Sequence, residues 1–209
     1  MSDDWSALAR DADERELRER ILTGYQAGKP FTPYVPTIDL PAARGRVLDF
    51  GCGLGRNFPY LRSVAAEVTG YDLAPMIGRC RTLADYRGVR LTADWAALRA
   101  ERFDLIFCAL VLQHVPPAVC ASALADFARM APSVYVLTRG ASDAGTSVIA
   151  AIAASEAFDA GPCVEVDHDP ATHQLRVIGV KPVGACLAPT DPVHYELLLR
   201  SRYNPRSPE

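Results

Sequence analysis

VLDFGCGLG, residues 47–55, is the stretch that decides the fold of this 209-residue chain. Its apolar first part predicts a short buried strand, and its second part places glycines at alternating positions, Gly51, Gly53 and Gly55. Glycine lacks a Cβ atom, so it suits a backbone that turns sharply or lies close to a ligand. The stretch therefore predicts a strand, a tight turn and a helix, with Asp49 two residues before the first glycine.

The spacing of the three glycines separates this turn from two other nucleotide-binding loops. A dinucleotide-binding fingerprint has its third glycine three residues after the second, which is position 56, where the chain has Arg56. A phosphate-binding P-loop would continue with Gly-Lys-Ser or Gly-Lys-Thr, and neither follows. An NAD(P)-dependent oxidoreductase with a Rossmann fold stays as an alternative that Arg56 disfavours.

Further apolar runs alternate with helical patterns along the chain. We expect strands at 46–50, 67–72, 89–92, 103–109 and 133–138, and helices at 56–65, 75–86 and 117–130. Continuous apolar strands that alternate with helices are typical of a parallel sheet covered on both faces. The predicted fold is α/β: a three-layer, Rossmann-like, doubly wound sandwich with a mostly parallel, seven-stranded sheet and an antiparallel C-terminal strand.

The amino-terminal residues 1–43 are expected to form a helix followed by an arm or lid. Residues 3–22 have apolar positions at helical spacing, and three prolines soon afterwards forbid regular structure. The aromatic residues of this region are expected either to form a lid over a bound ligand, a cofactor or a substrate, or to pack on the edge of the sheet. They are Tyr25, Phe31 and Tyr34.

The pattern is weaker in the second half of the predicted domain, which spans residues 44–203. We expect a helix at 144–158, strands at 163–167, 175–180 and 194–199, and a tail at 204–209. One or two of these strands should be antiparallel additions to the sheet. Which two form a hairpin stays open at this stage.

Composition excludes several classes of protein. The formal net charge is −3, which argues against a protein that binds by neutralising many phosphates. No apolar run approaches the roughly 20 residues that cross a bilayer, and the acidic amino terminus does not read as a secretory signal. We therefore expect a cytoplasmic protein whose six cysteines are free thiols. No metal site is expected, because the acidic and histidine residues near Asp167 read better as a polar turn.

Residues 44–140 resemble the class I S-adenosylmethionine-dependent methyltransferase family. Four motifs in the right order carry the resemblance: residues 47–55, GYDLAPM at 70–76, ADW at 93–95 and FDLIFCALVLQHV at 103–115. The resemblance implies S-adenosyl-L-methionine as the cofactor and transfer of its methyl group as the activity. A subunit that binds this cofactor without activity is a further alternative.

The resemblance also implies which residues bind the cofactor. They are Gly51, Cys52 and Gly53 at the methionine part, Asp72 at both ribose hydroxyls, Leu73 and Met76 beside adenine, Asp94 and the Trp95 backbone at the adenine edge, and the backbone of Cys108 and Ala109 at the methionine ammonium. Asp49 and Tyr34 complete the expected set. A carboxylate such as Asp72 at the end of a strand can accept two hydrogen bonds from a diol and would repel a 2′-phosphate.

His114 is the histidine nearest to the expected site. It is a candidate general base for a hydroxyl or amine acceptor, and it is equally open to a packing role before Pro116 and Pro117. The acceptor is expected to be a small molecule, since no basic stripe favours a nucleic acid and the DNA amino-methylation motif is missing after residue 109. No membrane partner is expected, and the oligomeric state stays open.

Overall fold

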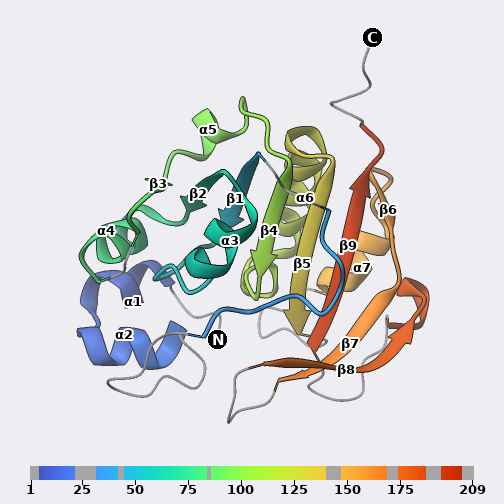
Figure 1. The fold of residues 1–209 in the computed structure, drawn as a ribbon, viewed down its shortest axis with the longest axis horizontal. Coiled ribbons are helices and arrows are strands. Elements are labelled where there is room, and N and C mark those ends of the chain that lie inside the picture. Colours follow the sequence, from blue (N-terminus) through green and yellow to red (C-terminus); the bar gives the residue numbers. More distant parts are fainter. Residues whose placement is uncertain are drawn as a thin grey trace.

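The computed structural model describes residues 5–21, 32–41, 45–83, 86–139, 147–168, 174–186 and 194–203. It is a three-layer α/β sandwich with one sheet between two layers, as expected (Figure 1). Tyr25, Phe31, the turn after His168 and the expected tail at 204–209 lie outside these residues. In the described ranges, no helix combines the length and the apolar character needed to cross a bilayer.

The elements alternate along the chain as the apolar pattern predicts. The strands are β1 (Arg46–Phe50), β2 (Glu67–Tyr71), β3 (Val89–Thr92), β4 (Leu105–Ala109), β5 (Ser133–Arg139), β6 (Phe158–Ala160), β7 (Cys163–His168), β8 (Leu175–Lys181) and β9 (His194–Ser201). The helices are α1 (Trp5–Asp11), α2 (Glu14–Ile21), α3 (Phe58–Val64), α4 (Ala74–Leu83), α5 (Trp95–Leu98), α6 (Pro117–Met130) and α7 (Val148–Ala153), with short 3-10 turns at η1 (Leu112–His114) and η2 (Val183–Cys186).

The strand order is β3-β2-β1-β4-β5-β9-β7-β8, with β6 paired to β9. Strands β1 to β5 are parallel, and β9 is antiparallel to β5, which confirms the doubly wound fold. The expected number of seven strands was wrong, because the described sheet has nine. The strands expected at 163–167 and 175–180 are β7 and β8, which pair with each other and join the sheet through β7 beside β9. Strand β6 was not expected, and it lies at the end of the expected helix 144–158.

Two expected helices differ in extent for local reasons. The single helix expected at 3–22 is divided into α1 and α2, because the Asp13 carboxylate accepts a hydrogen bond from the Glu16 N–H at 2.8 Å and begins a second helix there. The helix expected at 144–158 is only α7, with the Ser147 hydroxyl accepting from the Ala150 N–H at 3.1 Å.

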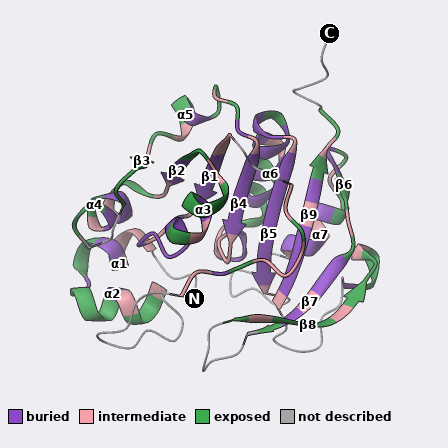
Figure 2. Cartoon of the chain, viewed as in Figure 1, coloured by how far each residue is buried: buried purple, intermediate pink, exposed green. Residues whose placement is uncertain are grey.

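The central strands are buried along most of their length (Figure 2), and their alternate residues belong to two separate core clusters. Val47 and Leu105 pack with α3, α4 and the segment 32–41 on one face. Leu48 and Ile106 pack with α5, α6 and α7 on the other. The central strands are therefore buried on both sides, which explains their continuous apolar sequence.

The extended segment 32–41 crosses the front of β5 and β9 (Figure 1). It is fastened to Glu196 of β9, whose carboxylate is fully buried and accepts from the Thr37 N–H at 3.0 Å and from the Tyr135 hydroxyl at 2.6 Å. Thr37 also donates its hydroxyl proton to Glu196. A part of the chain that precedes β1 is thus held by hydrogen bonds to a buried carboxylate of the last strand.

Helices α1 and α2 pack beneath α4, beside the carboxyl ends of β1 and β2 (Figure 1). Leu17 of α2 and Ala9 of α1 form a small core with Leu54 and Met76. The Arg79 guanidinium of α4 donates to the Ala12 carbonyl oxygen at 2.6 Å, and this hydrogen bond connects α4 to the amino-terminal helices. The amino-terminal helices therefore lie directly against the glycine turn.

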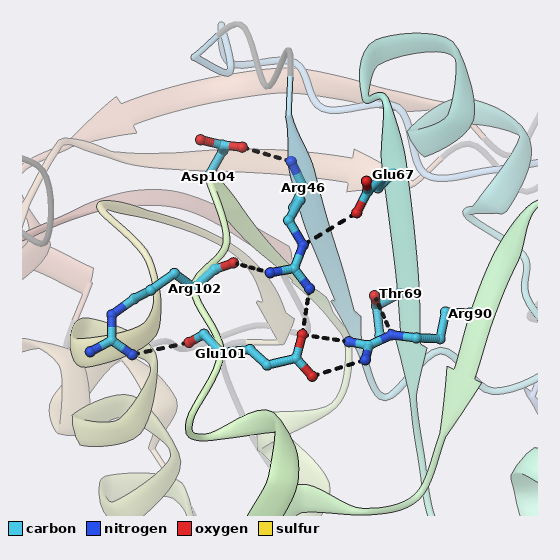
Figure 3. A network of polar contacts seen from close by, with 7 residues as sticks. All are labelled: Arg46, Glu67, Thr69, Arg90, Glu101, Arg102 and Asp104. Atoms are coloured by element: carbon cyan, nitrogen blue, oxygen red, sulfur yellow. Dashed lines mark hydrogen bonds and ion pairs between the residues drawn. The ribbon is translucent and has the colours of Figure 1, made fainter.

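The opposite, amino-terminal edge of the sheet carries a network of charged side chains (Figure 3). Arg90 of β3 makes a two-pronged contact with Glu101 at 2.8 and 2.9 Å, and Arg46 of β1 contacts Glu101 and, at 3.3 Å, Glu67. The Asp104 carboxylate accepts from the Arg46 N–H at 2.6 Å. This network joins the starts of the parallel strands on the side of the sheet away from the glycine turn.

Candidate cofactor-binding site

The glycine turn lies where the strand order reverses, between β1 and β4. In an open α/β sheet this switch point, outside the carboxyl ends of the strands, is where ligands bind. Gly51 has φ of +73°, and a Cβ atom there would lie 2.3 Å from Cγ2 of Val111. Gly53 has φ of +53°, with Ile21 of α2 next to it. Glycine is needed here both for the backbone angles and for close packing of neighbouring segments.

The backbone of the turn is tied to the end of β2. The N–H groups of Gly51 and Cys52 donate to the Tyr71 carbonyl oxygen at 2.8 and 3.0 Å. The Gly53 N–H donates to Asp72 Oδ2 at 2.7 Å, and the Leu73 N–H donates to Asp72 Oδ1 at 2.7 Å. Each carboxylate oxygen has a further lone pair, so Asp72 can accept hydrogen bonds from a diol while it holds the turn.

Asp72 and Asp49 are two neighbouring carboxylates with raised pKa values. Burial raises the pKa of Asp49 to about 8, the charge of Asp72 adds to the effect, and a hydrogen bond from Asn57 opposes it. Burial likewise raises the pKa of Asp72 to about 6, against the hydrogen bonds from the Gly53 and Leu73 N–H groups. Burial makes the negative charge of each carboxylate unfavourable, and a positive charge nearby would stabilise it. The site therefore favours a cationic ligand.

The fit of a cationic cofactor can be tested on Asp49. Its side chain is buried in the middle of β1, and Oδ2 has no hydrogen-bond partner among the described residues. A buried, unpaired carboxylate oxygen is unfavourable unless a ligand satisfies it. S-adenosylmethionine carries an ammonium and a sulfonium, so the glycine turn with Asp49 and Asp72 fits its charge.

The residues expected beside adenine are placed differently from one another. Leu73 is 42% exposed after β2, whereas Met76 is buried in the small core under α1 and α2. Asp94 is exposed, and its carboxylate caps α5 by accepting from the Ala97 N–H at 2.9 Å. This contact uses one carboxylate oxygen of Asp94, so the remaining lone pairs can still accept hydrogen bonds from a ligand.

Trp95 belongs to an aromatic cluster behind the ends of β1 and β2. Its indole packs against Phe50, Tyr71 and Phe127 with ring centroids 5.0–6.1 Å apart. Its Nε1–H donates to Asp126 at 3.2 Å. The side chain of Trp95 is thus held against the core, and the part that its backbone plays at the adenine edge stays a prediction.

Two cysteines of the expected site, Cys52 and Cys108, have buried thiols. The thiol of Cys52 is buried, and a hydrogen bond with Cys80 together with burial raises its pKa. Burial also raises the pKa of Cys108. All six cysteines of the chain are free and buried, which confirms that prediction. Neutral, enclosed thiols are inert toward substrates.

The backbone after β4 is strained where it meets the turn. Ala109 ends the strand, and Leu110 has φ of +60°, the one positive value at a non-glycine position in the described part of the chain. The Leu110 N–H donates to the Leu137 carbonyl oxygen at 2.7 Å, which holds this conformation. Strained residues of this kind concentrate at functional sites.

His114 lies at the end of η1, three residues after Val111. The ring of Trp5 in α1 packs edge-on against its imidazole with centroids 5.1 Å apart. Gln113 Nε2 lies 3.2 Å from His114 Nε2, and Gln113 Oε1 accepts from the Arg139 N–H at 2.8 Å. The contacts of Trp5 and Gln113 with His114 were not predicted, because neither residue stands in a local pattern that distinguishes it from a core residue.

Tyr34 is buried on the face of the sheet that α3 covers. Its N–H donates to Asn57 Oδ1 at 3.1 Å, and the guanidinium of Arg56 stacks on its ring at 4.5 Å. Arg56 is itself buried, and loss of solvent lowers its pKa. A buried arginine thus occupies the position at which a dinucleotide fingerprint needs glycine for close packing of helix and strand.

An open, mostly parallel sheet of this order with a glycine turn at its switch point has the fold of class I S-adenosylmethionine-dependent methyltransferases. Residues 48–133 match the family model described as "Methyltransferase domain". This match agrees, over that part of the chain, with the resemblance found in the sequence.

Relatives and solved structures agree on this region. The chain is similar to a ubiquinone biosynthesis O-methyltransferase of Xanthomonas axonopodis pv. citri, 40% identical over 85 residues, which are 37% of this chain and 35% of that protein. A protein of the same name from Xylella fastidiosa is 34% identical over 108 residues, 47% and 44% of the two chains. The chain thus spans about a third to under half of the length of these relatives.

The fold is shared with methyltransferases of low sequence identity. A TehB-like SAM-dependent methyltransferase from Corynebacterium glutamicum has a TM-score of 0.54 and 19% identity, over 78% of this chain and 83% of that one. A putative type 11 methyltransferase from Sulfolobus solfataricus has a TM-score of 0.51 and 14% identity, over 76% and 84%. At such identities the likeness establishes the fold alone.

Proposed function

We propose that this protein is an S-adenosylmethionine-dependent methyltransferase that acts on a small molecule. The observation that carries the proposal is the contact between the glycine turn and Asp72, with the unpaired oxygen of Asp49 beside it. This arrangement provides a hydrogen-bond acceptor for a sugar diol next to a place for a positive charge.

In this proposal the turn at Gly51 to Gly53 encloses the methionine part of the cofactor, and Asp49 satisfies a cationic group there. Asp72 holds the ribose. Leu73, Met76, Asp94 and the Trp95 backbone enclose adenine, the backbone at Cys108 and Ala109 receives the ammonium, and Tyr34 supports the turn through Asn57 and Arg56. The cofactor supplies an activated methyl group, and the chain supplies alignment and exclusion of water.

The acceptor side is proposed to lie between η1 and α1. The rings of His114 and Trp5 meet there. His114 comes three residues after Val111, whose side chain lies next to Gly51. His114 is the protein group that we propose to contact the acceptor. The names of the relatives support oxygen as the methylated atom, and the net charge of −3 supports a small molecule over a nucleic acid. We also propose a cytoplasmic location, which the six free thiols support.

Isothermal titration calorimetry separates this proposal from its alternatives. S-adenosylmethionine and S-adenosylhomocysteine should bind one per chain, and NAD and NADP should not bind. Binding of a dinucleotide in place of these ligands would overturn the proposal in favour of an oxidoreductase. Transfer of a radiolabelled methyl group to small phenols, acids, thiols or amines would exclude a binding subunit without activity.

A further inference from the structure

The orientation of the Gln113 amide is decided by a group that has only one hydrogen-bonding role. Gln113 is buried, and one end of its amide faces the backbone N–H of Arg139 at 2.8 Å. A backbone N–H donates and cannot accept, so the amide oxygen must face it. The Thr138 hydroxyl, 3.4 Å away, lies on the same side. The other end of the amide, at 3.2 Å from His114 Nε2, is therefore the NH₂ group.

The fixed amide in turn decides the state of the imidazole. An NH₂ group donates, so His114 Nε2 must accept and carries no proton in this arrangement. A neutral imidazole with a bare Nε2 has its proton on Nδ1. The edge of the Trp5 ring against the imidazole limits rotation of the side chain to another arrangement.

We propose that Gln113 is a positioning residue that fixes His114 as a neutral imidazole accepting at Nε2, so that Nε2 does not take a proton from the acceptor. This inference rests on the proposed function for its meaning in catalysis. The lone pair that a general base would use at Nε2 is already engaged by an amide that the backbone of β5 holds in place.

The inference narrows the class of acceptor. The C–S bond breaks with its electron pair passing to sulfur, and a lone pair of the acceptor atom forms the new bond to the methyl carbon. An anionic acceptor cancels the positive charge of the sulfonium, and no proton moves. The site therefore suits an acceptor that is already ionised near neutral pH, such as a carboxylic acid or an acidic phenol, over an aliphatic alcohol that needs a base.

The tautomer of His114 can be measured without a substrate. Protein labelled with ¹⁵N-histidine gives long-range ¹H–¹⁵N correlations that distinguish protonated from bare ring nitrogens. The chain has four histidines, so the signals of His114 are those lost in His114→Gln. We expect Nε2 to be bare and Nδ1 protonated in the wild-type protein, with and without S-adenosylhomocysteine. A protonated Nε2 in either state would overturn the inference.

A pair of variants isolates the contribution of Gln113. Gln113→Glu still accepts from the Arg139 N–H but presents an oxygen to Nε2, so the proton should move to Nε2. Thr138→Val is the matched control, because it removes the weaker hydroxyl contact and keeps the amide oxygen on Arg139; its tautomer should stay as in the wild type. An unchanged tautomer in Gln113→Glu would overturn the role of Gln113.

The two proposals fail in different ways. Loss of S-adenosylhomocysteine binding in the wild type would refute the proposed function and leave the tautomer measurement intact. Normal binding together with a protonated Nε2 would refute only the positioning role. Wild-type methylation of an aliphatic alcohol that His114→Ala abolishes would contradict the inference and keep the proposed function.

Discussion

Replacement of Asp49 by asparagine should stabilise the protein without ligand and weaken its hold on the cofactor. The substitution keeps the shape of the side chain and removes its charge. In the wild type, burial and the charge of Asp72 raise the pKa of Asp49 from 3.8 to about 8. Between these two values the native protein keeps a proton that the unfolded chain has released, so the free energy of unfolding of the wild type falls as pH rises.

The size of the effect follows from the shift. About four pKa units at 1.36 kcal/mol each give an upper limit of about 5 kcal/mol near pH 8. Relaxation around the site and imperfect hydrogen bonds to the amide reduce this, and we expect Asp49→Asn to gain about 1–3 kcal/mol there. The gain should be close to zero near pH 4, where Asp49 is neutral in the native protein and half protonated in the unfolded chain.

Urea unfolding at several pH values between about 4 and 8 measures the difference between variant and wild type. Groups remote from the site titrate alike in both proteins, so the difference reports Asp49 together with its coupling to Asp72. Asp167→Asn is the control, because Asp167 lies exposed on β7 and pairs only loosely with Arg176 at 3.3 Å. A difference for Asp49→Asn that stays constant across this range would refute the argument.

The same variant tests the role of Asp49 in binding. A bound cation lowers the pKa of a neighbouring carboxyl group, so S-adenosylmethionine should release a proton from Asp49 at pH 7. Calorimetry in buffers of different ionisation enthalpy should detect this proton for the wild type and not for Asp49→Asn. The variant should also bind at least about tenfold more weakly, which corresponds to about 1.4 kcal/mol.

Three other predictions concern separate parts of the molecule. Asp72→Ala should weaken S-adenosylhomocysteine binding by about 1.5–3 kcal/mol, the range for hydrogen bonds to a charged group, and unchanged calorimetric affinity would remove the ribose assignment. Glu101→Gln should lower the free energy of unfolding by about 1 kcal/mol through loss of exposed ion pairs. Since the Arg90 and Arg46 guanidiniums lower the pKa of Glu101 below 4.5, this difference should be present above that pH and vanish as pH falls through the lower native value; a difference that persists in acid would contradict it. Arg79→Met should speed proteolysis within α1 and α2, with the rest of the domain protected, and equal cleavage rates would show that its contact with Ala12 is dispensable.

Local sequence patterns predicted the central sheet because its strands are buried on both faces. Such strands are continuous apolar runs, and β3 and α6 begin and end at the residues expected for them. The positions of Gly51 in a turn and of Asp72 at a strand end could be predicted for the same kind of reason, since turns and strand ends are local features. Their mutual contact through the Gly53 N–H required the fold.

Features that depend on distant contacts escaped prediction. Strand β6 is three residues long and exists because β9 offers it a partner, so no local pattern distinguishes it from the end of a helix. Gln113 stands beside His114 in sequence, yet its meaning comes from the Arg139 backbone 26 residues away. Trp5 reads as one apolar position of a helix until α1 is seen to reach His114.

A crystal structure with S-adenosylhomocysteine tests the central claim most directly. The ribose hydroxyls should lie on the Asp72 carboxylate, and the amino-acid part should lie within the turn at Gly51 to Gly53 near Asp49. The ligand bound elsewhere on the chain, or this position empty at saturating ligand, would contradict the account.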